Sequence, residues 1–285
     1  MRKQKRVAAI HDISCFGKCS LTVVLPVLSA AGLEACCIPT AVLSTHTGGF
    51  SGYTYRDLTE DVLPVAAHWK SLNLHFDAVY TGYLGSLEQV DILKDVLDTI
   101  ADENSMIVID PVMGDNGSLY AGFTEAFPKA MAGLCGRADV IVPNITEACL
   151  LLGKPYHNGP YTQAEIDELM NGLETLGAKK IVLTGVYFDN SAVGAAVLDA
   201  VTGERATVLK ERIDGFYHGT GDVYASALTA ALLRDFSLTD SARIAAEFTV
   251  ESIKATQDLD ENLHYGVNFE QTLPRLIRML EKGAE

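Results

Sequence analysis

The stretch AVYTGYLGSLEQVDILKDVLDTIADENSMIVIDP, residues 78–111, decides the fold class. It opens with the short apolar run Ala78–Thr81, and after a glycine-containing turn its apolar residues recur at positions 90, 93, 97 and 100. That spacing places them on one face of a helix over Leu87–Ile100. A second apolar run, Met106–Ile109, ends at Asp110-Pro111, where the proline cannot continue a central strand. Two buried strands joined by an amphipathic helix predict a β-α-β unit with parallel strands.

The same alternation extends from this unit in both directions. Further strands are predicted at Val7–His11, Ala35–Val42, Val140–Val142 and Ile181–Leu183, with a strand pair at Ala192–Leu198 and Ala206–Leu209. Further helices are predicted at Leu21–Ala31, Leu58–Leu72, Phe123–Leu134, Thr146–Leu152, Ala164–Leu176, Val223–Leu233, Ser241–Lys254 and Phe269–Glu281. This order predicts an α/β fold, a three-layer α/β/α sandwich around a mostly parallel central sheet. No linker or break in composition divides the chain, so residues 1–285 are predicted to form one domain.

The composition restricts the classes of function. The 285 residues carry 22 Lys and Arg against 37 Asp and Glu, a formal charge of −15, so a nucleic-acid partner is not expected. The basic start precedes an apolar run of only Val7–Ile10, which is too short for a signal peptide. The longest apolar stretch, Cys19–Leu33, is too short to cross a bilayer, so no membrane partner is expected. The six cysteines show no zinc spacing and lie mostly in apolar segments, which predicts buried reduced thiols in a cytoplasmic protein.

The strongest candidate for chemistry is Gly219-Thr220-Gly221-Asp222, which directly precedes a predicted helix. Two glycines permit a tight turn, and the amides at a helix N-terminus favour an anion. The carboxylate of Asp222 could take a proton from an alcohol while these amides stabilise a phosphoryl group in transfer. An Asp in the first turn of a helix is also a common structural arrangement, so these four residues alone leave both interpretations open.

Further polar residues follow predicted strands, where ligands of parallel sheets bind. Asp110 and Asp115 flank a loop, and two carboxylates there can hold Mg²⁺ through water or face the phosphates of a nucleotide; a plain Asp-Pro turn is the alternative. Asn144 and Glu147 can face one way on a first helical turn and hold a hydrated Mg²⁺. The alternative for this pair is an N-cap Asn with a capping-box Glu. Thr184 could offer its hydroxyl to a phosphate.

Taken together, three of these elements resemble the ribokinase-like superfamily of small-molecule kinases: Asp110–Asp115, Asn144–Glu147 and Gly219–Asp222. Three segments are more specifically similar to the pyridoxal kinase family: Ser44–Gly48, Thr81–Ser86 and Asp110–Gly114. The similarity runs from about residue 6 to about residue 255. It implies ATP-dependent phosphorylation of the 5′-hydroxyl of pyridoxal, pyridoxine or pyridoxamine, with ATP and Mg²⁺ as cofactors. A monovalent cation is also compatible with the resemblance, which further implies a homodimer.

The resemblance also implies a role for each site residue. The catalytic group would be Asp222, with the amides of Gly219, Thr220 and Gly221 as the anion hole. Mg²⁺ would be organised by Glu147 and Asn144, and the nucleotide phosphates would lie near Asp110, Asp115, Asn144 and Thr184. The vitamin pocket would be lined by Asp12, His46, Thr47 and Tyr83, and Gln257–Val267 is a candidate for a loop on the nucleotide side.

Asp12 departs from the family pattern, which commonly has a serine facing the pyridine ring at this position. A carboxylate there could pair with a protonated ring nitrogen or select a different heterocycle. A hydroxymethylpyrimidine kinase of thiamine synthesis is therefore the nearer alternative function. A non-catalytic B6-binding protein on the same fold is the more distant one, because a fold does not fix a function.

Overall fold

A computed structural model describes residues 4–257 and 265–281 of the chain. Its centre is a nine-stranded sheet in the order β11-β10-β9-β8-β5-β4-β1-β2-β3, and β6 and β7 form a separate hairpin. The strands are β1 (Arg6–Ser14), β2 (Glu34–Leu43), β3 (Tyr55–Asp57), β4 (Ala78–Thr81), β5 (Met106–Ile109), β6 (Gly114–Asp115), β7 (Ser118–Leu119), β8 (Val140–Ile141), β9 (Lys180–Val186), β10 (Ala192–Asp199) and β11 (Glu204–Glu211). Neighbours from β9 to β2 run parallel, while β3, β10 and β11 pair antiparallel at the two edges. The mostly parallel sheet is confirmed.

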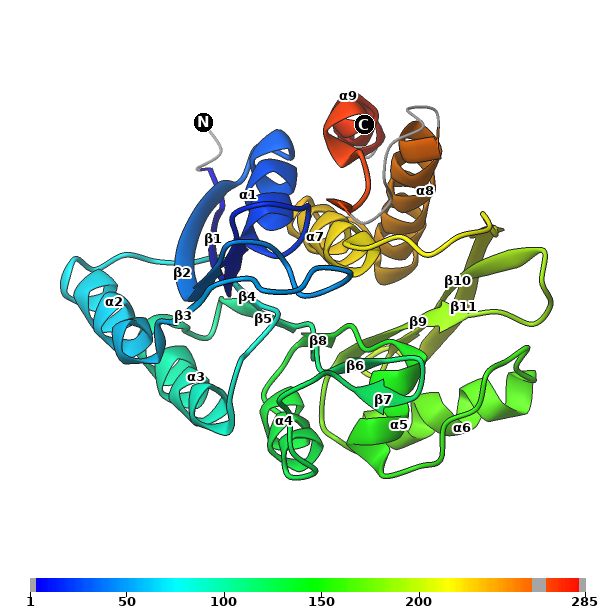
Figure 1. The fold of residues 1–285 in the computed structure, drawn as a ribbon, viewed down its shortest axis with the longest axis horizontal. Coiled ribbons are helices and arrows are strands. Elements are labelled where there is room, and N and C mark those ends of the chain that lie inside the picture. Colours follow the sequence, from blue (N-terminus) through cyan, green and yellow to red (C-terminus); the bar gives the residue numbers. More distant parts are fainter. Residues whose placement is uncertain (1–3, 258–264, 282–285) are drawn as a thin grey trace.

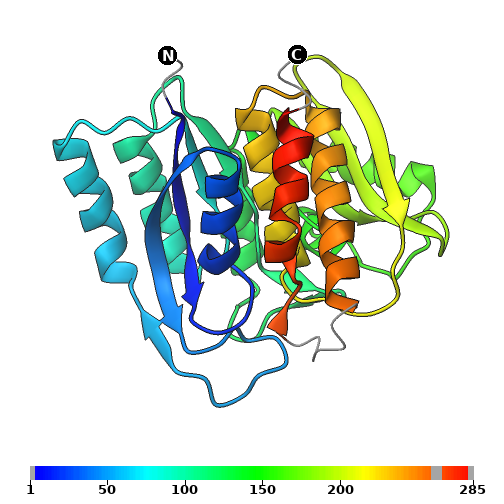
Figure 2. The ribbon, with the colours of Figure 1, turned by 90° about the horizontal axis from the view of Figure 1, so that it is seen from above.

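Helices cover both faces of this sheet (Figure 1). One face carries α1 (Leu21–Ala30), α7 (Thr220–Leu233), α8 (Leu238–Gln257) and α9 (Leu273–Glu281), which lie side by side in Figure 2. The other face carries α2 (Thr59–Ser71), α3 (Leu87–Ile100), α4 (Phe127–Cys135), α5 (Ile145–Leu152) and α6 (Gln163–Glu174). A short 3-10 helix, η2 (Phe269–Gln271), precedes α9. The three-layer sandwich is therefore confirmed.

The stretch Val7–Ile10 of the central strand β1 is apolar because both faces of the strand are covered. On β1, Val7 and Ala9 join the core beneath α1 and α7, while Ala8 and Ile10 join the core on the opposite face. All four side chains are fully buried. Alternate residues of a strand point to opposite faces, so a doubly covered strand needs an apolar residue at every position.

The first strand is longer than the sequence predicted. The run Val7–His11 was expected to end at a polar loop, but β1 continues through His11 and Asp12 to Ser14. The pairing register with β2 shifts between His11 and Ile13, as at a β-bulge, and the pairing resumes from Ile13 to Ser14. Asp12 is therefore a strand residue, buried in the sheet rather than placed in a loop.

Two helix boundaries also differ from the prediction. The helix expected from Phe123 begins at Phe127, with Pro128 in its first turn, where a missing amide hydrogen costs nothing. The helix expected over Phe269–Glu281 is divided into η2 and α9, and Pro274 lies in the first turn of α9. In both places a proline marks the start of the helix.

The expectation of buried thiols is only partly correct. All six cysteines are free, but Cys135 and Cys149 are the buried ones, and Cys15 is exposed. Cys15 lies just after β1, where the chain leaves the core for the surface. In the described ranges, no helix combines the length and the apolar character that crossing a membrane requires.

Candidate functional site

Four buried or partly buried acids gather at the carboxyl end of the sheet. Asp12 lies on β1, Asp110 directly follows β5, and Glu147 lies in the first turn of α5, which follows β8. Asp222 reaches the same place from the start of α7, where its charge interacts with those of Asp12 and Asp110. The sheet thus brings together residues far apart in the sequence, at the edge where parallel sheets bind ligands.

The first turn of α7 is built to leave its amides available. Gly219 is the N-cap residue at φ +75°, and no side chain caps the helix. The hydroxyl of Thr220 donates instead to the Tyr217 carbonyl at 3.1 Å. The tetrapeptide was expected to precede the helix, but Thr220, Gly221 and Asp222 form its first turn. Amides without an intrahelical acceptor at a positive helix end favour an anionic ligand.

Asp222 has the pKa of a base that works at neutral pH. Burial raises the pKa of its carboxyl from 3.8 to about 7, and the nearby charge of Asp12 adds to the shift. The backbone amide of Ser20 acts in the opposite direction and lowers the pKa of this carboxyl. A carboxylate of this pKa can accept a proton from an alcohol near pH 7.

Asp110 and Glu147 form a buried acidic pair whose charges repel each other. Both side chains are less than a tenth exposed, and burial raises the pKa of each carboxyl above its ordinary range. Repulsion from Glu147 and then from Asp222 raises the pKa of Asp110 further. Such a cluster of acids fits a divalent cation, whose positive charge would balance the carboxylates. Across the described ranges no three His, Cys, Asp or Glu side chains enclose a metal position. The acidic pair therefore fits a hydrated ion that has few direct protein ligands.

Asn144 and Glu147 form a capping box. The Asn144 Oδ1 atom accepts from the Glu147 amide at 2.9 Å, and Glu147 Oε2 accepts from the Asn144 amide at 2.8 Å. Glu147 Oε1 also accepts from the Met113 amide at 3.2 Å, and Asn144 Nδ2 donates to the Gly114 carbonyl at 3.0 Å. The structural alternative from the sequence is confirmed: this pair caps α5 and ties it to the loop after β5.

Two residues expected on the nucleotide side lie at the rim of this cluster. Asp115 lies in the β6–β7 hairpin, and its carboxylate accepts from the Asn116 amide at 2.8 Å. Partial burial raises the pKa of Asp115. Thr184 lies on β9, and its backbone bridges to Asn144 in a short parallel pairing. The loop expected over Gln257–Val267 falls mostly outside the described residues.

The residues expected around a vitamin form two neighbouring pairs, Asp12 with Tyr83 and His46 with Thr47, and differ in their exposure. Asp12 is buried, and Tyr83 is half-buried near it: burial, the Tyr55 hydroxyl and the Asp12 charge raise the pKa of Tyr83. His46 is also buried, and its Nδ1 atom accepts from the Gly48 amide at 3.1 Å. Thr47, next to His46, is exposed on the loop between β2 and β3.

Two residues at the site were missed by sequence reasoning. The Ser20 hydroxyl donates to Asp12 and the Ser20 amide lowers the pKa of Asp222, but a serine directly before an apolar helix has the sequence of an ordinary N-cap. Tyr120 follows the β6–β7 hairpin, and the pKa of its hydroxyl is raised by burial and by Glu147, Asp115, Asp110 and Asp222. No local pattern distinguishes that tyrosine from a surface residue, since only the folded hairpin brings it to the acids.

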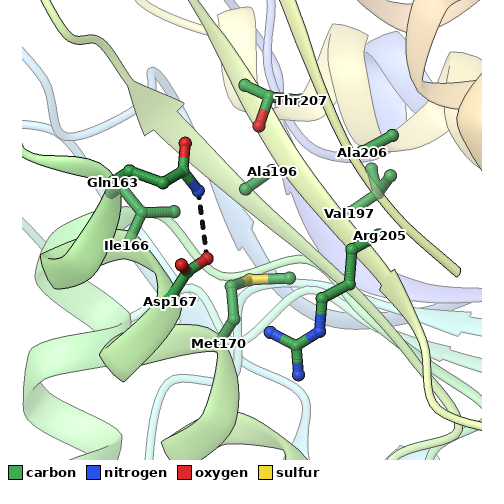
Figure 3. A pocket seen from close by; sticks show the side chains of 9 residues that line it. All are labelled: Gln163, Ile166, Asp167, Met170, Ala196, Val197, Arg205, Ala206 and Thr207. Atoms are coloured by element: carbon green, nitrogen blue, oxygen red, sulfur yellow. Dashed lines mark hydrogen bonds between the residues drawn. The ribbon is translucent and has the colours of Figure 1, made fainter. Parts of the chain in front are cut away.

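A separate hollow of about 260 Å³ lies between α6 and the strands β10 and β11, as Figure 3 shows. Ile166 and Met170 contribute apolar surface, and Gln163 donates a hydrogen bond to Asp167 across its rim at 3.0 Å. None of the site residues described above lines this hollow. It is therefore not part of the acidic site.

Comparison with known proteins agrees with this geometry. The model of the phosphomethylpyrimidine kinase family matches residues 25–268. A Bacteroides thetaiotaomicron protein, assigned as a phosphomethylpyrimidine kinase and crystallised with pyridoxal, is 37% identical, with a TM-score of 0.91 and 96% of each chain covered. Pyridoxal kinase from Lactobacillus plantarum is 32% identical, with a TM-score of 0.89 and 98% of each chain covered.

A curated relative, the pyridoxine/pyridoxal/pyridoxamine kinase of Bordetella avium, is 28% identical over 267 residues, which are 89% of this chain and 86% of the relative. The similarity to a ribokinase-like family of vitamin kinases is thus confirmed over nearly the whole length of the chain. Because the family model matches most of the chain, and solved relatives share its fold, the protein belongs to the phosphomethylpyrimidine kinase family.

Proposed function

We propose that the protein is an ATP-dependent kinase that phosphorylates the 5′-hydroxyl of pyridoxal, pyridoxine or pyridoxamine. The observation that carries this proposal is the position of Asp222, an acid with a pKa of about 7 in the uncapped first turn of α7. The substrate class is supported by the relatives, of which one was crystallised with pyridoxal and another is named for all three vitamers.

The chain's own residues would divide the transfer between a base and an anion site. The carboxylate of Asp222 takes the proton of the 5′-hydroxyl as that oxygen bonds to the terminal phosphorus of ATP. The bond from this phosphorus to its bridging oxygen breaks, and ADP leaves. The amides of Gly219, Thr220 and Gly221 stabilise the negative charge on the transferring group.

The acidic pair would serve the metal and the nucleotide. Bound Mg²⁺ supplies neutralisation of the phosphate charge, and Asp110 and Glu147 would hold it, in part through water. Asn144 fixes the Glu147 carboxylate through the capping box. Asp115 and Thr184 would lie on the phosphate side of the same cluster.

The vitamin would lie on the other side of Asp222, among Asp12, His46, Thr47 and Tyr83. Asp12 is a buried acid: burial raises the pKa of its carboxyl, while the hydroxyls of Ser20 and Ser14 lower it. A substrate ring that carries a positive charge would supply a counter-charge there. This arrangement favours a heterocycle with a protonated ring nitrogen.

We expect the activity to depend on pH through Asp222. Its carboxyl has a pKa of about 7 and must be ionised to accept a proton, so activity is lost as the pH falls. Below that pKa, kcat/KM for the vitamer should fall about tenfold per pH unit, and above it kcat/KM should level off. A profile that is flat from about pH 5 to about pH 8 would show that Asp222 is not the base.

Replacing Glu147 by Gln should change the response to Mg²⁺. The amide keeps the shape of the side chain but removes the charge, so we expect half-maximal activity to need about tenfold more Mg²⁺. Glu165 provides the matched control, because it closes the same kind of capping box at the start of α6 and is exposed on the surface. A titration in which E147Q and E165Q respond to Mg²⁺ like the wild type would exclude Glu147 from the metal site.

The test of the whole proposal is a product assay with MgATP and a panel of hydroxymethyl heterocycles. We expect phosphorylated pyridoxal, pyridoxine or pyridoxamine as the main product. Hydroxymethylpyrimidine belongs in the panel because the matching family model is that of phosphomethylpyrimidine kinase. If this pyrimidine is the preferred acceptor, the vitamer assignment is wrong, and if no acceptor is phosphorylated, the kinase proposal fails.

We further propose that the protein acts in the cytoplasm as a homodimer. The resemblance to pyridoxal kinases supports this assembly. Light scattering coupled to size-exclusion chromatography would measure the mass directly, and a species of twice the chain mass of 30.7 kDa is the expected result.

A further inference from the structure

Ser20 occupies the N-cap position of α1 but does not cap the helix. Its backbone has φ 51° and ψ −135°, and its side chain accepts no hydrogen bond from the first turn. Ser86, the N-cap of α3, shows the ordinary arrangement, with an extended backbone and a hydroxyl that accepts from the Gln89 amide. A positive φ is costly for any residue other than glycine, and such strain persists only where the surroundings enforce it.

The hydroxyl of Ser20 is directed at Asp12 instead. Its Oγ atom donates to Asp12 Oδ1 at 2.5 Å, and the Ser14 hydroxyl donates to Asp12 Oδ2 at 3.1 Å. Ser20 is 7% exposed and Asp12 4% exposed, so the Ser20 bond is shielded from water. A buried hydrogen bond to a carboxylate is strong enough to hold a strained turn in place.

The backbone of the same turn faces the base. The Ser20 amide lies near enough to the Asp222 carboxyl to lower its pKa. The preceding residues pack directly against the start of α7: a Cβ atom at Gly219 would lie 2.0 Å from the Lys18 carbonyl oxygen. The turn Lys18–Ser20 therefore lies between Asp12 and Asp222. It also contacts the first turn of α7, whose amides are proposed to bind the anion.

We infer that Ser20 is a positioning residue that links Asp12 to Asp222. Its hydroxyl, anchored on Asp12, holds the strained turn, and the turn keeps the Ser20 amide directed at the Asp222 carboxylate. This inference rests on the proposed function, in which Asp222 is the base. One carboxylate oxygen of Asp222 is then fixed by the amide, and the other is left to receive the proton of the substrate hydroxyl. Small errors in such an alignment have large effects on rate.

The decisive variant is Ser20→Gly. Glycine adopts this backbone without strain, which offsets the lost hydrogen bond to Asp12, so the variant should still fold, as thermal unfolding would show. It lacks the hydroxyl, so the turn is no longer held. We expect kcat to fall about tenfold or more, with a smaller change in the KM of the vitamer. Ser237→Gly is the matched control, because Ser237 caps the Asp240 amide at the start of α8, and this variant should keep full kcat.

A double-mutant cycle tests whether Ser20 acts through Asp12. In Asp12→Asn the charged acceptor is already lost, so adding Ser20→Gly should lower kcat by less than it does in the wild type. The inference is overturned if Ser20→Gly keeps kcat within about twofold of the wild type or changes only KM. It is also overturned if the effects of the two substitutions on kcat are fully additive. A wild-type protein that phosphorylates no vitamer would reject the proposed function as well, whereas an active wild type with an equally active S20G rejects this inference alone.

Discussion

Asp222→Asn is expected to lower kcat about a thousandfold or more while the fold stays intact. The amide has the size of the carboxylate but cannot accept the hydroxyl proton, and a positioned general base contributes about a hundred- to ten-thousandfold. The amides of Gly219–Gly221 remain in this variant, so a residual rate from phosphate binding should survive. Steady-state kinetics with MgATP and the best vitamer would measure both effects.

The same substitution is expected to stabilise the protein at neutral and alkaline pH. The pKa of Asp222 is 3.8 in an ordinary environment and about 7 in the folded protein, so the folded state binds the proton more tightly than the unfolded chain does. Wild-type stability therefore falls as the pH rises through this window, by an amount on the order of 1 to 4 kcal/mol. Asn cannot ionise, so the gain of D222N over the wild type should grow from about pH 4 to about pH 7.

Asp240→Asn is the matched control for both measurements. Asp240 also lies in the first turn of a helix, α8, but its side chain is half-exposed and pairs with Arg243 on the surface. D240N should keep full activity, and its stability relative to the wild type should not increase as the pH rises. Near-normal turnover of D222N would remove Asp222 from the mechanism. An inactive D222N that is less stable than the wild type at every pH would point to a structural role.

Features set by neighbours in the sequence could be predicted from the sequence. The helix Leu87–Ile100 was predicted from its apolar period, and its bounds are confirmed. The spacing of Thr162 and Glu165 in the sequence predicts a capping box, and the structure contains it. In both cases the interacting residues are three or four positions apart, so the physical cause lies within the segment itself.

The arrangement of the site could be anticipated only in part. The order of strands implied that Asp110, Glu147 and Asp222 would reach the same edge of the sheet, and the structure places their charges within interaction range. The long course of β1 and the strained backbone of Ser20 were not predicted. Pairing with β2 stabilises the far end of β1. Contacts with Asp12 and α7 hold Ser20 in its strained backbone conformation. Neither cause is visible in the local sequence, because each depends on residues brought in by the fold.

Gly219→Ala is expected to abolish most activity and to destabilise the fold. Gly219 has φ +75°, and an added Cβ would lie 2.0 Å from the Lys18 carbonyl oxygen, a backbone atom that cannot turn aside. The turn Lys18–Ser20 or the start of α7 must move, and either shift displaces the amides from the phosphoryl group. We expect kcat to fall about a hundredfold or more, the loss typical of removing one oxyanion donor.

Gly203→Ala separates the steric clash from the backbone strain. Gly203 has the same φ of +75°, in the turn between β10 and β11, but no atom of the described residues lies within 4 Å of its added Cβ. G203A should lose about 1 kcal/mol of stability from the strained φ and keep its activity. G219A should lose more stability than this, and the excess measures how tightly the Lys18–Ser20 turn is packed against α7. If the two variants lose equal stability and both stay active, the close contact at Gly219 does not matter for phosphoryl transfer. The anion-binding role of the first turn of α7 would then have to be abandoned.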